Sequence, residues 1–333
     1  MRKRLTIITP SYEDQISLKE LFLGLNQALH LIGNNVDVSL VYVNDSPWNY
    51  FPIDNLVDAV KMSLAPFSIS EIIGLNLSQN LGHQKALITG LAYAYNKYAH
   101  NSQYILMDCD GEDRPIDVPR LYDSINNLTP TSFAVVASRK RRHEDRVFKL
   151  GYFLYKIFFK FLSGKRIDFG NFMILRSTCA LALIKSPVAQ SHIATALIRS
   201  RFPFTSLPVS RGFRYSGSSK MGGKAKLITL GIIAIGTFAE EVITRFLIVN
   251  SFALCSMFFV SLILVINFFF GVFPPIPGWT SSILVFLLGI SLLLGLQLLN
   301  AIFSLSVLRN LDGVTGFDMV NDYIESVEIK QLR

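Results

Sequence analysis

Residues 104–113 read Tyr104-Ile-Leu-Met-Asp108-Cys-Asp110-Gly-Glu112-Asp113. The apolar start of this stretch predicts a buried strand, and the acidic residues follow where that strand ends. Alternate side chains of an extended chain point the same way, so we expect Asp108, Asp110 and Glu112 to converge. Three converging carboxylates suit Mg²⁺ or Mn²⁺, which prefer oxygen ligands and usually share their site with substrate phosphates. The alternative is an exposed acidic turn that opens a helix near Pro115.

Three further short apolar runs, at residues 5–9, 39–43 and 133–137, also predict strands that end in polar residues. Helix-like patterns at 17–31 and 81–98 lie between the strands. This alternation predicts an α/β fold with a mostly parallel sheet that is covered by helices on both faces. Ligands bind such sheets beyond the carboxyl ends of the strands. The charged residues expected at that edge are Glu13, Asp45, Asp108, Asp110 and Arg139.

The C-terminal third of the chain has a different composition. Over all 333 residues, 50% are hydrophobic and 17% are charged, whereas soluble domains average about 25% charged residues. Neither a charged residue nor a histidine lies between Arg245 and Arg309. Residues 246–270 and 280–308 are each long enough to cross about 30 Å of hydrocarbon as a helix. Because a turn-rich break at 271–278 separates them, we predict a transmembrane hairpin.

Basic residues flank the hairpin at its two outer ends, and the connecting loop has none; they are Lys220, Lys224, Lys226, Arg245 and Arg309. Positive charge stays on the cytoplasmic side, so we expect an integral membrane protein with its N-terminal domain in the cytosol. Residues 227–239 are apolar but too few to cross, and they predict a helix at the membrane interface. The predicted division is a cytosolic domain at 1–218, an interfacial amphipathic region at 219–245, a transmembrane hairpin at 246–308 and a cytosolic tail at 309–333.

The formal net charge of +8 favours an anionic partner, such as membrane lipid, phosphate or nucleic acid. Residues 169–239 contain nine Lys or Arg and no acidic residue. They form either a basic face attracted to lipid headgroups or a phosphate-binding site, and the two interpretations are compatible. The three cysteines match no zinc or disulfide spacing, which favours a reducing compartment. The apolar run near the start ends at Pro10, too early for an export signal.

Several motifs follow one another along the chain. They are Ile8-Thr-Pro10-Ser-Tyr12-Glu13, Val43-Asn44-Asp45-Ser46, Asn80-Leu-Gly82-His-Gln-Lys-Ala86-Leu-Ile-Thr-Gly90, the acidic stretch at 104–113, Arg139-Lys-Arg-Arg142, Asp168-Phe-Gly170-Asn-Phe172 and Arg214-Tyr-Ser-Gly217-Ser-Ser219-Lys220. In this order they resemble the motifs of the inverting family 2 glycosyltransferases. The hydrophobic hairpin narrows the resemblance to dolichyl- or undecaprenyl-phosphate sugar transferases. It covers nearly the whole chain and implies a Rossmann-like glycosyltransferase-A fold with an interfacial helix and two C-terminal transmembrane helices.

The resemblance also implies a role for each motif. The nucleoside of a nucleotide-sugar donor would be held by Pro10, Tyr12, Glu13 and Asp45, and the metal with the diphosphate by Asp108, Asp110 and Glu112. Phosphates of the acceptor or donor would be bound by Arg139 and Arg142, and the lipid headgroup by Arg214, Ser219 and Lys220. Asp110, Arg139 and Arg142 would be the catalytic residues. Lys85 is a further candidate for a donor phosphate, whereas His83 is interpreted as a polar residue at a helix start.

Three departures from the family pattern bear on specificity. Asn44 replaces an acid in the nucleoside loop, and Glu112 replaces a glutamine beside the metal. Asn171 and Met173 replace an aspartate and an arginine of the family's D-F-R segment. The sequence therefore leaves the nucleotide base and the acceptor-side contacts open, together with the sugar and the length of the lipid.

The implied reaction transfers a sugar, with inversion, to a polyprenyl phosphate in the assembly of a cell-envelope polysaccharide. A phosphate monoester has a second pKa of about 6 and is already ionised at cytosolic pH, so no general base is required. One alternative is transfer to a hydroxyl of another lipid or a polysaccharide, which would need a base. Another is a membrane protein that binds nucleotides without turnover. Nucleic acid is not an expected partner, and a homo-oligomer formed through interfacial helices stays open.

Overall fold

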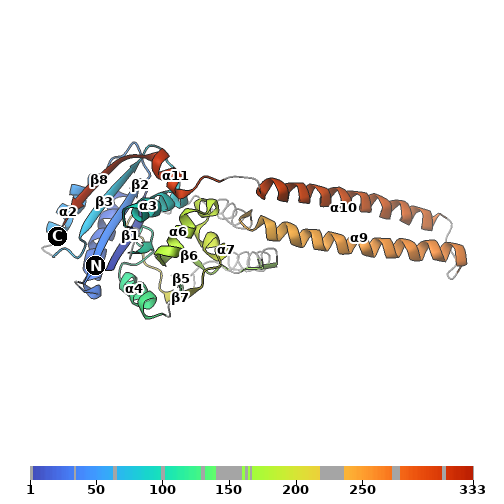
Figure 1. Ribbon diagram of the computed structural model, residues 1–333, viewed down its shortest axis with the longest axis horizontal. Coiled ribbons are helices and arrows are strands. Elements are labelled where there is room, and N and C mark those ends of the chain that lie inside the picture. Colours follow the sequence, from blue (N-terminus) through green and yellow to red (C-terminus); the bar gives the residue numbers. More distant parts are fainter. Residues whose placement is uncertain are drawn as a thin grey trace. The chain divides into compact units, whose positions relative to one another are not determined.

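A computed structural model of the chain describes residues 3–33, 35–62, 66–98, 102–128, 132–139, 160–161, 164–165, 167–217, 236–271, 278–309 and 313–332. The chain forms two compact units. Unit 1 comprises Met1–Gly151, Arg166–Thr237 and Gly313–Arg333, and unit 2 comprises Tyr152–Lys165 and Phe238–Asp312. Unit 1 contains the β-sheet and unit 2 contains two long helices (Figure 1).

Within the described residues, unit 1 is built on one eight-stranded sheet with the strand order β7-β5-β6-β4-β1-β2-β3-β8. The strands are β1 (Lys3–Ser11), β2 (Val36–Asn44), β3 (Glu71–Leu77), β4 (Ser102–Leu106), β5 (Ala134–Arg139), β6 (Phe169–Arg176), β7 (Phe204–Val209) and β8 (Ile324–Gln331). Only β6 and β8 run antiparallel to their neighbours among these strands. The other six therefore end at one edge, and the predicted mostly parallel sheet is confirmed.

Helices cover both faces of the sheet (Figure 1). One face carries α1 (Gln15–Ala28), η1 (Leu29–Ile32), α2 (Ile53–Met62) and α4 (Asp117–Asn127), and the other carries α3 (His83–Tyr98), α6 (Ser177–Ile184), η2 (Pro187–Gln190), α7 (Ile193–Arg199) and α11 (Gly316–Tyr323). Side chains alternate along each strand, so Ile7 and Leu40 enter the first hydrophobic cluster and Ile8 and Val41 the second. Both faces are buried, as in other parallel sheets.

The apolar runs predicted at 5–9, 39–43, 104–107 and 133–137 coincide with β1, β2, β4 and β5, and the predicted helices at 17–31 and 81–98 with α1 and α3. Strands β3, β6, β7 and β8 were not predicted from the sequence. Hydrophobicity does not mark β8, because three residues of its sequence Ile-Glu-Ser-Val-Glu-Ile-Lys-Gln are charged. Its partner β3 is entirely buried, so the edge of β3 needs a strand to pair with its backbone groups.

The C-terminal segment is therefore not the separate tail predicted at 309–333. After α11 the chain returns to unit 1, and β8 pairs antiparallel with β3. Polar side chains hold this edge strand: Gln331 donates from Nε2 to Oε1 of Glu71 at 2.5 Å, and Lys330 pairs with Asp54. The physical reason for the correction is that backbone pairing does not require a hydrophobic strand.

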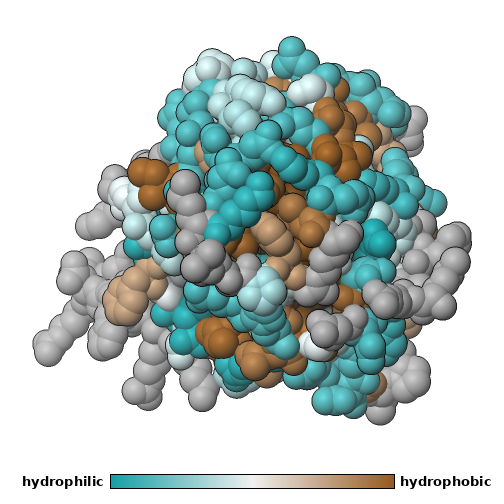
Figure 2. All heavy atoms as spheres, turned by 90° about the vertical axis from the view of Figure 1, so that its left-hand side faces the viewer, coloured by the Kyte–Doolittle hydropathy of each residue, from teal (hydrophilic) through white to brown (hydrophobic). Residues whose placement is uncertain are grey.

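Unit 2 contains α9 (Ala239–Phe270) and α10 (Trp279–Arg309), which pack side by side. By length and composition, Ala239–Phe270 and Ser281–Ser304 are candidate membrane spans. Most of their large exposed side chains are apolar, for example Phe252 and Phe269, whereas the face of the molecule in Figure 2 is mostly hydrophilic with separate hydrophobic patches. Exposed apolar surface of this extent marks a lipid or protein partner.

Helix α9 begins before the span predicted at 246–270. Residues 239–245, assigned from the sequence to an interfacial region, are continuous with α9, because nothing between Arg245 and Phe246 breaks the helix. Glu240 and Glu241 occupy its first turn, where carboxylates interact favourably with the helix dipole. The rest of that predicted region up to residue 235 lies outside the described residues.

The motif from Asn80 to Gly90 has a backbone explanation. Gly82 has a φ of +82°, a left-handed conformation that favours glycine. Ala86 is fully buried in α3. At Gly90 an added Cβ would lie 2.6 Å from Cγ2 of Val43 and 2.8 Å from Cγ2 of Ile8. The absence of a side chain at Gly90 thus lets α3 approach β1 and β2 closely.

We expect Gly90→Ala to lower the free energy of unfolding by about 1–3 kcal/mol, because the new methyl overlaps two packed side chains. Denaturant unfolding of the full-length protein in detergent measures this effect. Gly170→Ala is the matched control, because no atom of the described residues outside its chain neighbours lies within 4 Å of the position of its added Cβ. Equal stability of the two variants would contradict the close packing of α3.

Candidate active site

The parallel strands bring loops that are far apart in the sequence to one edge of the sheet. The backbone N–H of Asp45 donates to the carbonyl of Ser11 at 2.9 Å, and that of Met107 to the carbonyl of Ile8 at 3.1 Å. The loops after β1, β2 and β4 are thereby joined side by side. This is the edge where ligands bind in parallel α/β sheets.

The acidic loop after β4, residues 108–114, is folded around its own carboxylates. Asp113 is buried, and its Oδ2 accepts a hydrogen bond from the backbone N–H of Asp108 at 3.0 Å. Oδ1 of Asp110 accepts from the N–H of Glu112 at 2.9 Å. Gly111 has a φ of +91° at the turn between them. Asp113 therefore shapes the loop, a role that the sequence did not reveal.

The loop after β7, residues 210–217, lies against this acidic loop. Backbone N–H groups of Gly212 and Tyr215 donate to the carbonyls of Glu112 and Asp110, both at 2.9 Å. The contact is close, because a Cβ at Gly212 would lie 2.1 Å from the carbonyl oxygen of Gly111. The two loops form one structural element at the edge of the sheet.

Guanidinium groups from the loop after β7 neutralise the acidic loop. Nη2 of Arg214 lies 2.6 Å from Oδ2 of Asp110 and 3.5 Å from Oε1 of Glu112. Nη2 of Arg211 lies 2.5 Å from the same Glu112 oxygen. Arg214, predicted from the resemblance to face the lipid headgroup, thus contacts the candidate metal ligands.

Burial raises the pKa of Asp110 above its usual value, and the charge of Asp108 raises it further. The N–H of Glu112 and the guanidinium of Arg214 act in the opposite direction, but they do not cancel the effect. A second positive charge beside the Asp110 carboxylate would therefore stabilise its ionised form.

The Asp45 carboxylate is buried and fixes the loop that precedes α3. Its Oδ1 accepts from the N–H of Leu81 at 2.7 Å and its Oδ2 from the N–H of Gly82 at 2.9 Å. In addition, Nδ2 of Asn80 donates to the backbone carbonyl of Asp45. Burial raises the pKa of Asp45, and the two N–H groups lower it. Since backbone amides bind both oxygens, the observed role of this side chain is to position the start of α3.

Helix α3 starts at His83, and this residue faces the acidic loop. Nε2 of His83 lies 3.1 Å from Oδ1 of Asp108 and 2.9 Å from Nδ2 of Asn171. Burial alone would lower the pKa of His83, but the Asp108 carboxylate raises it above its usual value. The sequence indicated a helix start and did not indicate these contacts, because β6 brings Asn171 to the edge from 88 residues away.

The loops after β1 and β2 form the other side of the edge. The ring of Tyr12 meets Trp48 edge to face, with 6.2 Å between ring centroids. Nε1 of Trp48 donates to Oε1 of Glu13 at 2.9 Å. Asn44 is buried, and its Nδ2 donates to the carbonyl of Asn49 and to Asn76. The side-chain amide of Asn44, which stands where the family has an acid, therefore makes hydrogen bonds to other residues of the protein.

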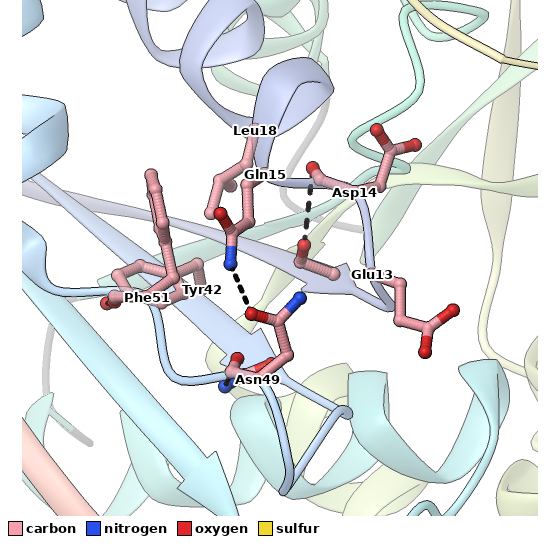
Figure 3. A pocket seen from close by; sticks show the side chains of 9 residues that line it. Glu13, Asp14, Gln15, Leu18, Tyr42, Asn49 and Phe51 are labelled. Atoms are coloured by element: carbon pink, nitrogen blue, oxygen red, sulfur yellow. Dashed lines mark hydrogen bonds between the residues drawn. The ribbon is translucent and has the colours of Figure 1, made fainter.

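A small pocket lies beside these loops (Figure 3). Gln15 and Asn49 point toward one another there, with Nε2 of Gln15 donating to Oδ1 of Asn49 at 2.8 Å, while the Glu13 carboxylate points away from them. Glu13 has a left-handed φ of 46°, and its N–H donates to Oγ of Ser46. The loop that presents Glu13 is therefore held by the loop after β2.

A sequence profile of glycosyl transferase family 2 matches residues 6–186. This range contains the ends of β1, β2, β3, β4 and β5, five of the six described strands that end at this edge. The chain belongs to glycosyl transferase family 2. As a member of this family it is a glycosyltransferase that uses a nucleotide-sugar donor, and its mostly parallel sheet is of the glycosyltransferase-A type.

Solved structures are similar to this glycosyltransferase at low identity. Glucosyl-3-phosphoglycerate synthase from Mycobacterium tuberculosis, in complex with Mn²⁺, UDP-glucose and phosphoglyceric acid, is 14% identical with a TM-score of 0.47, covering 72% of this chain and 80% of its own. Mannosyl-3-phosphoglycerate synthase from Rubrobacter xylanophilus is 14% identical with a TM-score of 0.44, covering 73% and 75%. A search of curated proteins gave no significant match. At these values no residue role is transferred.

The remaining predicted site residues of this family 2 glycosyltransferase fall into three groups. Pro10 is buried at the end of β1, and Lys85 is exposed on α3. Arg139 ends β5 at the same edge as the acidic loop. Arg142, Ser219 and Lys220 lie outside the described residues. Among the residues that the structure describes, no group of three His, Cys, Asp or Glu side chains is arranged to hold a metal ion, and Glu112 instead pairs with arginines.

We expect Asp45→Asn to lower the free energy of unfolding by roughly 1–3 kcal/mol, because the new amide NH₂ faces a backbone donor and leaves it unsatisfied. Amide hydrogen exchange at Leu81 and Gly82 should become faster. Asp58→Asn is the control, because Asp58 is exposed on α2 and pairs only with Lys61 in the described structure. Its expected effect is below about 0.5 kcal/mol. Unchanged exchange in Asp45→Asn would contradict the proposed positioning of α3.

Proposed function

We propose that this glycosyltransferase transfers a sugar from a nucleotide-diphosphate sugar to a polyprenyl phosphate at the cytosolic face of a membrane. The path of the chain supports the proposal best. It leaves unit 1, forms the two apolar helices α9 and α10, and returns to the sheet of unit 1 as β8. If both helices cross a bilayer, both of their outer ends stay on the side of unit 1. A catalytic unit tethered in this way suits an acceptor that lies in the membrane.

The loop after β7 adds a second supporting observation. Phe213 is 94% exposed, and it lies between Arg211 and Arg214. A phenylalanine flanked by arginines suits a lipid whose headgroup is a phosphate, because guanidinium groups bind phosphate by charge-assisted hydrogen bonds. The guanidinium groups would contact the phosphate, and the ring would contact the first part of the prenyl chain.

Asp108 and Asp110 fit a divalent cation of the Mg²⁺ or Mn²⁺ type. Their oxygens are the ligands that these ions prefer. Burial, together with the charge of Asp108, raises the pKa of Asp110. Mg²⁺ usually takes one or two carboxylates together with substrate phosphates, so a set of three protein ligands is not needed. When bound, such a cation would neutralise charge on the departing nucleotide diphosphate. Glu112 is left out of this set because two arginines, Arg211 and Arg214, lie against its Oε1, whereas Asp110 pairs with Arg214 alone.

The chain's own residues bring two anions together in this proposal. The acceptor phosphate oxygen forms a bond to the anomeric carbon from the face opposite the donor diphosphate, and the bond from that carbon to the diphosphate oxygen breaks. The electron pair of that bond leaves with the nucleotide diphosphate, and the configuration at the anomeric carbon is inverted. The acceptor is ionised at neutral pH, so the protein supplies positive charge and orientation, chiefly from Arg139, Arg142 and Arg214.

Radiolabelled sugar transfer to undecaprenyl or dolichyl phosphate, assayed with a panel of nucleotide sugars and Mg²⁺ or Mn²⁺, tests the proposal. We expect Asp110→Asn to reduce the rate at least about 100-fold, since it removes charge that positions the cation and diphosphate. Glu112→Gln is the matched variant, and we expect it to keep the apparent metal affinity within about threefold, because in this proposal Glu112 binds Arg211 and Arg214 and not the cation. If both variants lost metal affinity equally, Glu112 would be a metal ligand and the proposed set of two carboxylates would be wrong.

Two outcomes would contradict the proposed reaction, one in the same transfer assay and one when that assay is combined with a nucleotide-binding measurement. Transfer to a lipid or polysaccharide hydroxyl, with polyprenyl phosphate inert, would identify a glycosyltransferase of the second predicted class. Nucleotide binding without transfer to any acceptor would identify a non-catalytic homologue.

The membrane arrangement is tested by cysteine labelling in a Cys255→Ser background, in which the remaining Cys109 and Cys179 are buried. In sealed vesicles with the cytosolic face outward, we expect an impermeant maleimide to label Val314→Cys, which lies in unit 1. Ser281→Cys, at the start of α10, should react only after detergent opens the vesicles. Labelling of both positions in intact vesicles would exclude the hairpin.

A further inference from the structure

Asp117 is a buried carboxylate that the proposed reaction does not use. It is the first residue of α4, and only 1% of its side chain is exposed. None of the motifs quoted from the sequence includes it. Burying a charged side chain is unfavourable unless hydrogen bonds and opposite charge satisfy it. The partners of Asp117 therefore show what the buried charge holds in place.

Two arginines donate to Asp117. Nε of Arg114 donates to Oδ2 at 2.9 Å, and Nη2 of the same guanidinium donates to Oδ1 at 3.1 Å. This two-point contact fixes the plane of the guanidinium as well as its position. Nη1 of Arg120 donates to Oδ1 at 2.5 Å. Asp117, Arg114 and Arg120 together form a group of ion pairs, the Asp117 clamp.

The two arginines of the Asp117 clamp also contact the end of β7 and the loop that follows it. Nη2 of Arg120 donates to the carbonyl oxygen of Pro208 at 3.5 Å, one residue before β7 ends. The side chain of Arg114 lies against Gly212, since a Cβ added there would be 2.8 Å from Cγ of Arg114. The Asp117 clamp thus contacts the loop after β7 at its base and again at Gly212.

The position of Gly212 matters because residues on both sides of it face the acidic loop. Arg211 pairs with Glu112, and Arg214 pairs with Asp110. In the proposed reaction Arg214 orients the acceptor phosphate beside the metal and diphosphate. A displacement of reacting groups by about 1 Å can lower the rate about 100-fold. A contact that fixes this loop therefore acts on the reaction without touching a substrate.

We propose that Asp117 is a positioning residue for the acceptor. Through Arg114 and Arg120 it sets the place of the loop after β7, and with it the place of Arg211 and Arg214. This inference rests on the proposed function, because it takes that loop to bind the acceptor phosphate. The alternative is that the buried ion pairs only stabilise unit 1, and the experiments below separate the two roles.

Sugar-transfer kinetics of the full-length protein in detergent, with polyprenyl phosphate and the nucleotide sugar varied in turn, test the proposal. We expect Arg114→Lys to raise the KM for polyprenyl phosphate at least about 10-fold, because lysine keeps the charge but loses the two-point contact. The KM for the nucleotide sugar should stay within about threefold, because this substitution keeps the carboxylates of the acidic loop. Asp123→Asn is the control, because Asp123 is an exposed carboxylate of the same helix. It should leave both KM values unchanged.

Asp117→Asn is the second variant, and we expect a larger rise in the KM for polyprenyl phosphate, because both arginines lose a charged acceptor. Removing one partner of a buried ion pair also destabilises a protein, so thermal unfolding of each variant accompanies the kinetics. If Asp117→Asn does not fold, Arg114→Lys decides, since it keeps the buried carboxylate and a positive charge beside it.

Amide hydrogen exchange gives a readout that needs no substrate. The N–H groups of Gly212 and Tyr215 donate to the acidic loop, and that of Met107 donates to Ile8 within the sheet. We expect Gly212 and Tyr215 to exchange at least about 10-fold faster in Arg114→Lys than in the parent, with Met107 unchanged. Faster exchange at all three positions would indicate a general loss of stability and would overturn the inference.

The kinetic outcomes separate this inference from the function on which it rests. An equal rise in both KM values, or a fall in kcat alone, would mean that the ion pairs only stabilise unit 1. An unchanged acceptor KM in folded Arg114→Lys would overturn the inference as well. If the unmodified protein transfers no sugar to polyprenyl phosphate, the proposed acceptor is wrong. The exchange of Gly212 and Tyr215 then decides by itself whether the Asp117 clamp positions the loop.

Discussion

The buried carboxylate of Asp45 is the contact on which the geometry of the active-site edge depends. Burying a charged group is unfavourable unless hydrogen bonds satisfy it, and here the N–H groups of Leu81 and Gly82 do so. These amides belong to the turn that opens α3, so the charge and the turn stabilise each other. The helix that starts at this turn places His83 3.1 Å from Asp108 and packs closely on β1 and β2 at Gly90.

The acidic loop shows how a concentration of negative charge is kept in a folded protein. Each carboxylate has at least one partner: Asp108 meets His83, Asp110 meets Arg214, Glu112 meets Arg211 and shares Arg214, and Asp113 accepts a backbone N–H. Three of these partners are cationic groups or can become so. The loop after β7 supplies both arginines, so its position and the charge of the acidic loop are coupled. A site built this way presents both signs of charge to a diphosphate and a metal ion.

The path of the chain links this chemistry to the apolar helices. The helices α9 and α10 are inserted between β7 and β8, two strands of the same sheet that lie at its opposite edges. Pairing of β8 with β3 joins distant parts of the chain, which costs loop entropy that the backbone hydrogen bonds and the contacts of Glu71 and Asp54 must offset. As a result, the chain joins both outer ends of the helix pair to unit 1.

The sequence by itself determined the α/β class, four of the strands, the two apolar helices and the family, because these depend on hydrophobic periodicity and on motifs that are local in the chain. It also indicated that Asp108 and Asp110 lie at a strand end. Only the tertiary structure decided that Asp45 and Asp113 bind backbone amides, that Glu112 pairs with arginines, that Asn171 reaches His83 and that β8 completes the sheet. Each of these is a contact between segments far apart in the sequence or a choice among possible partners for a carboxylate. Such choices depend on distance and burial in the folded chain, which a pattern of residue types does not contain.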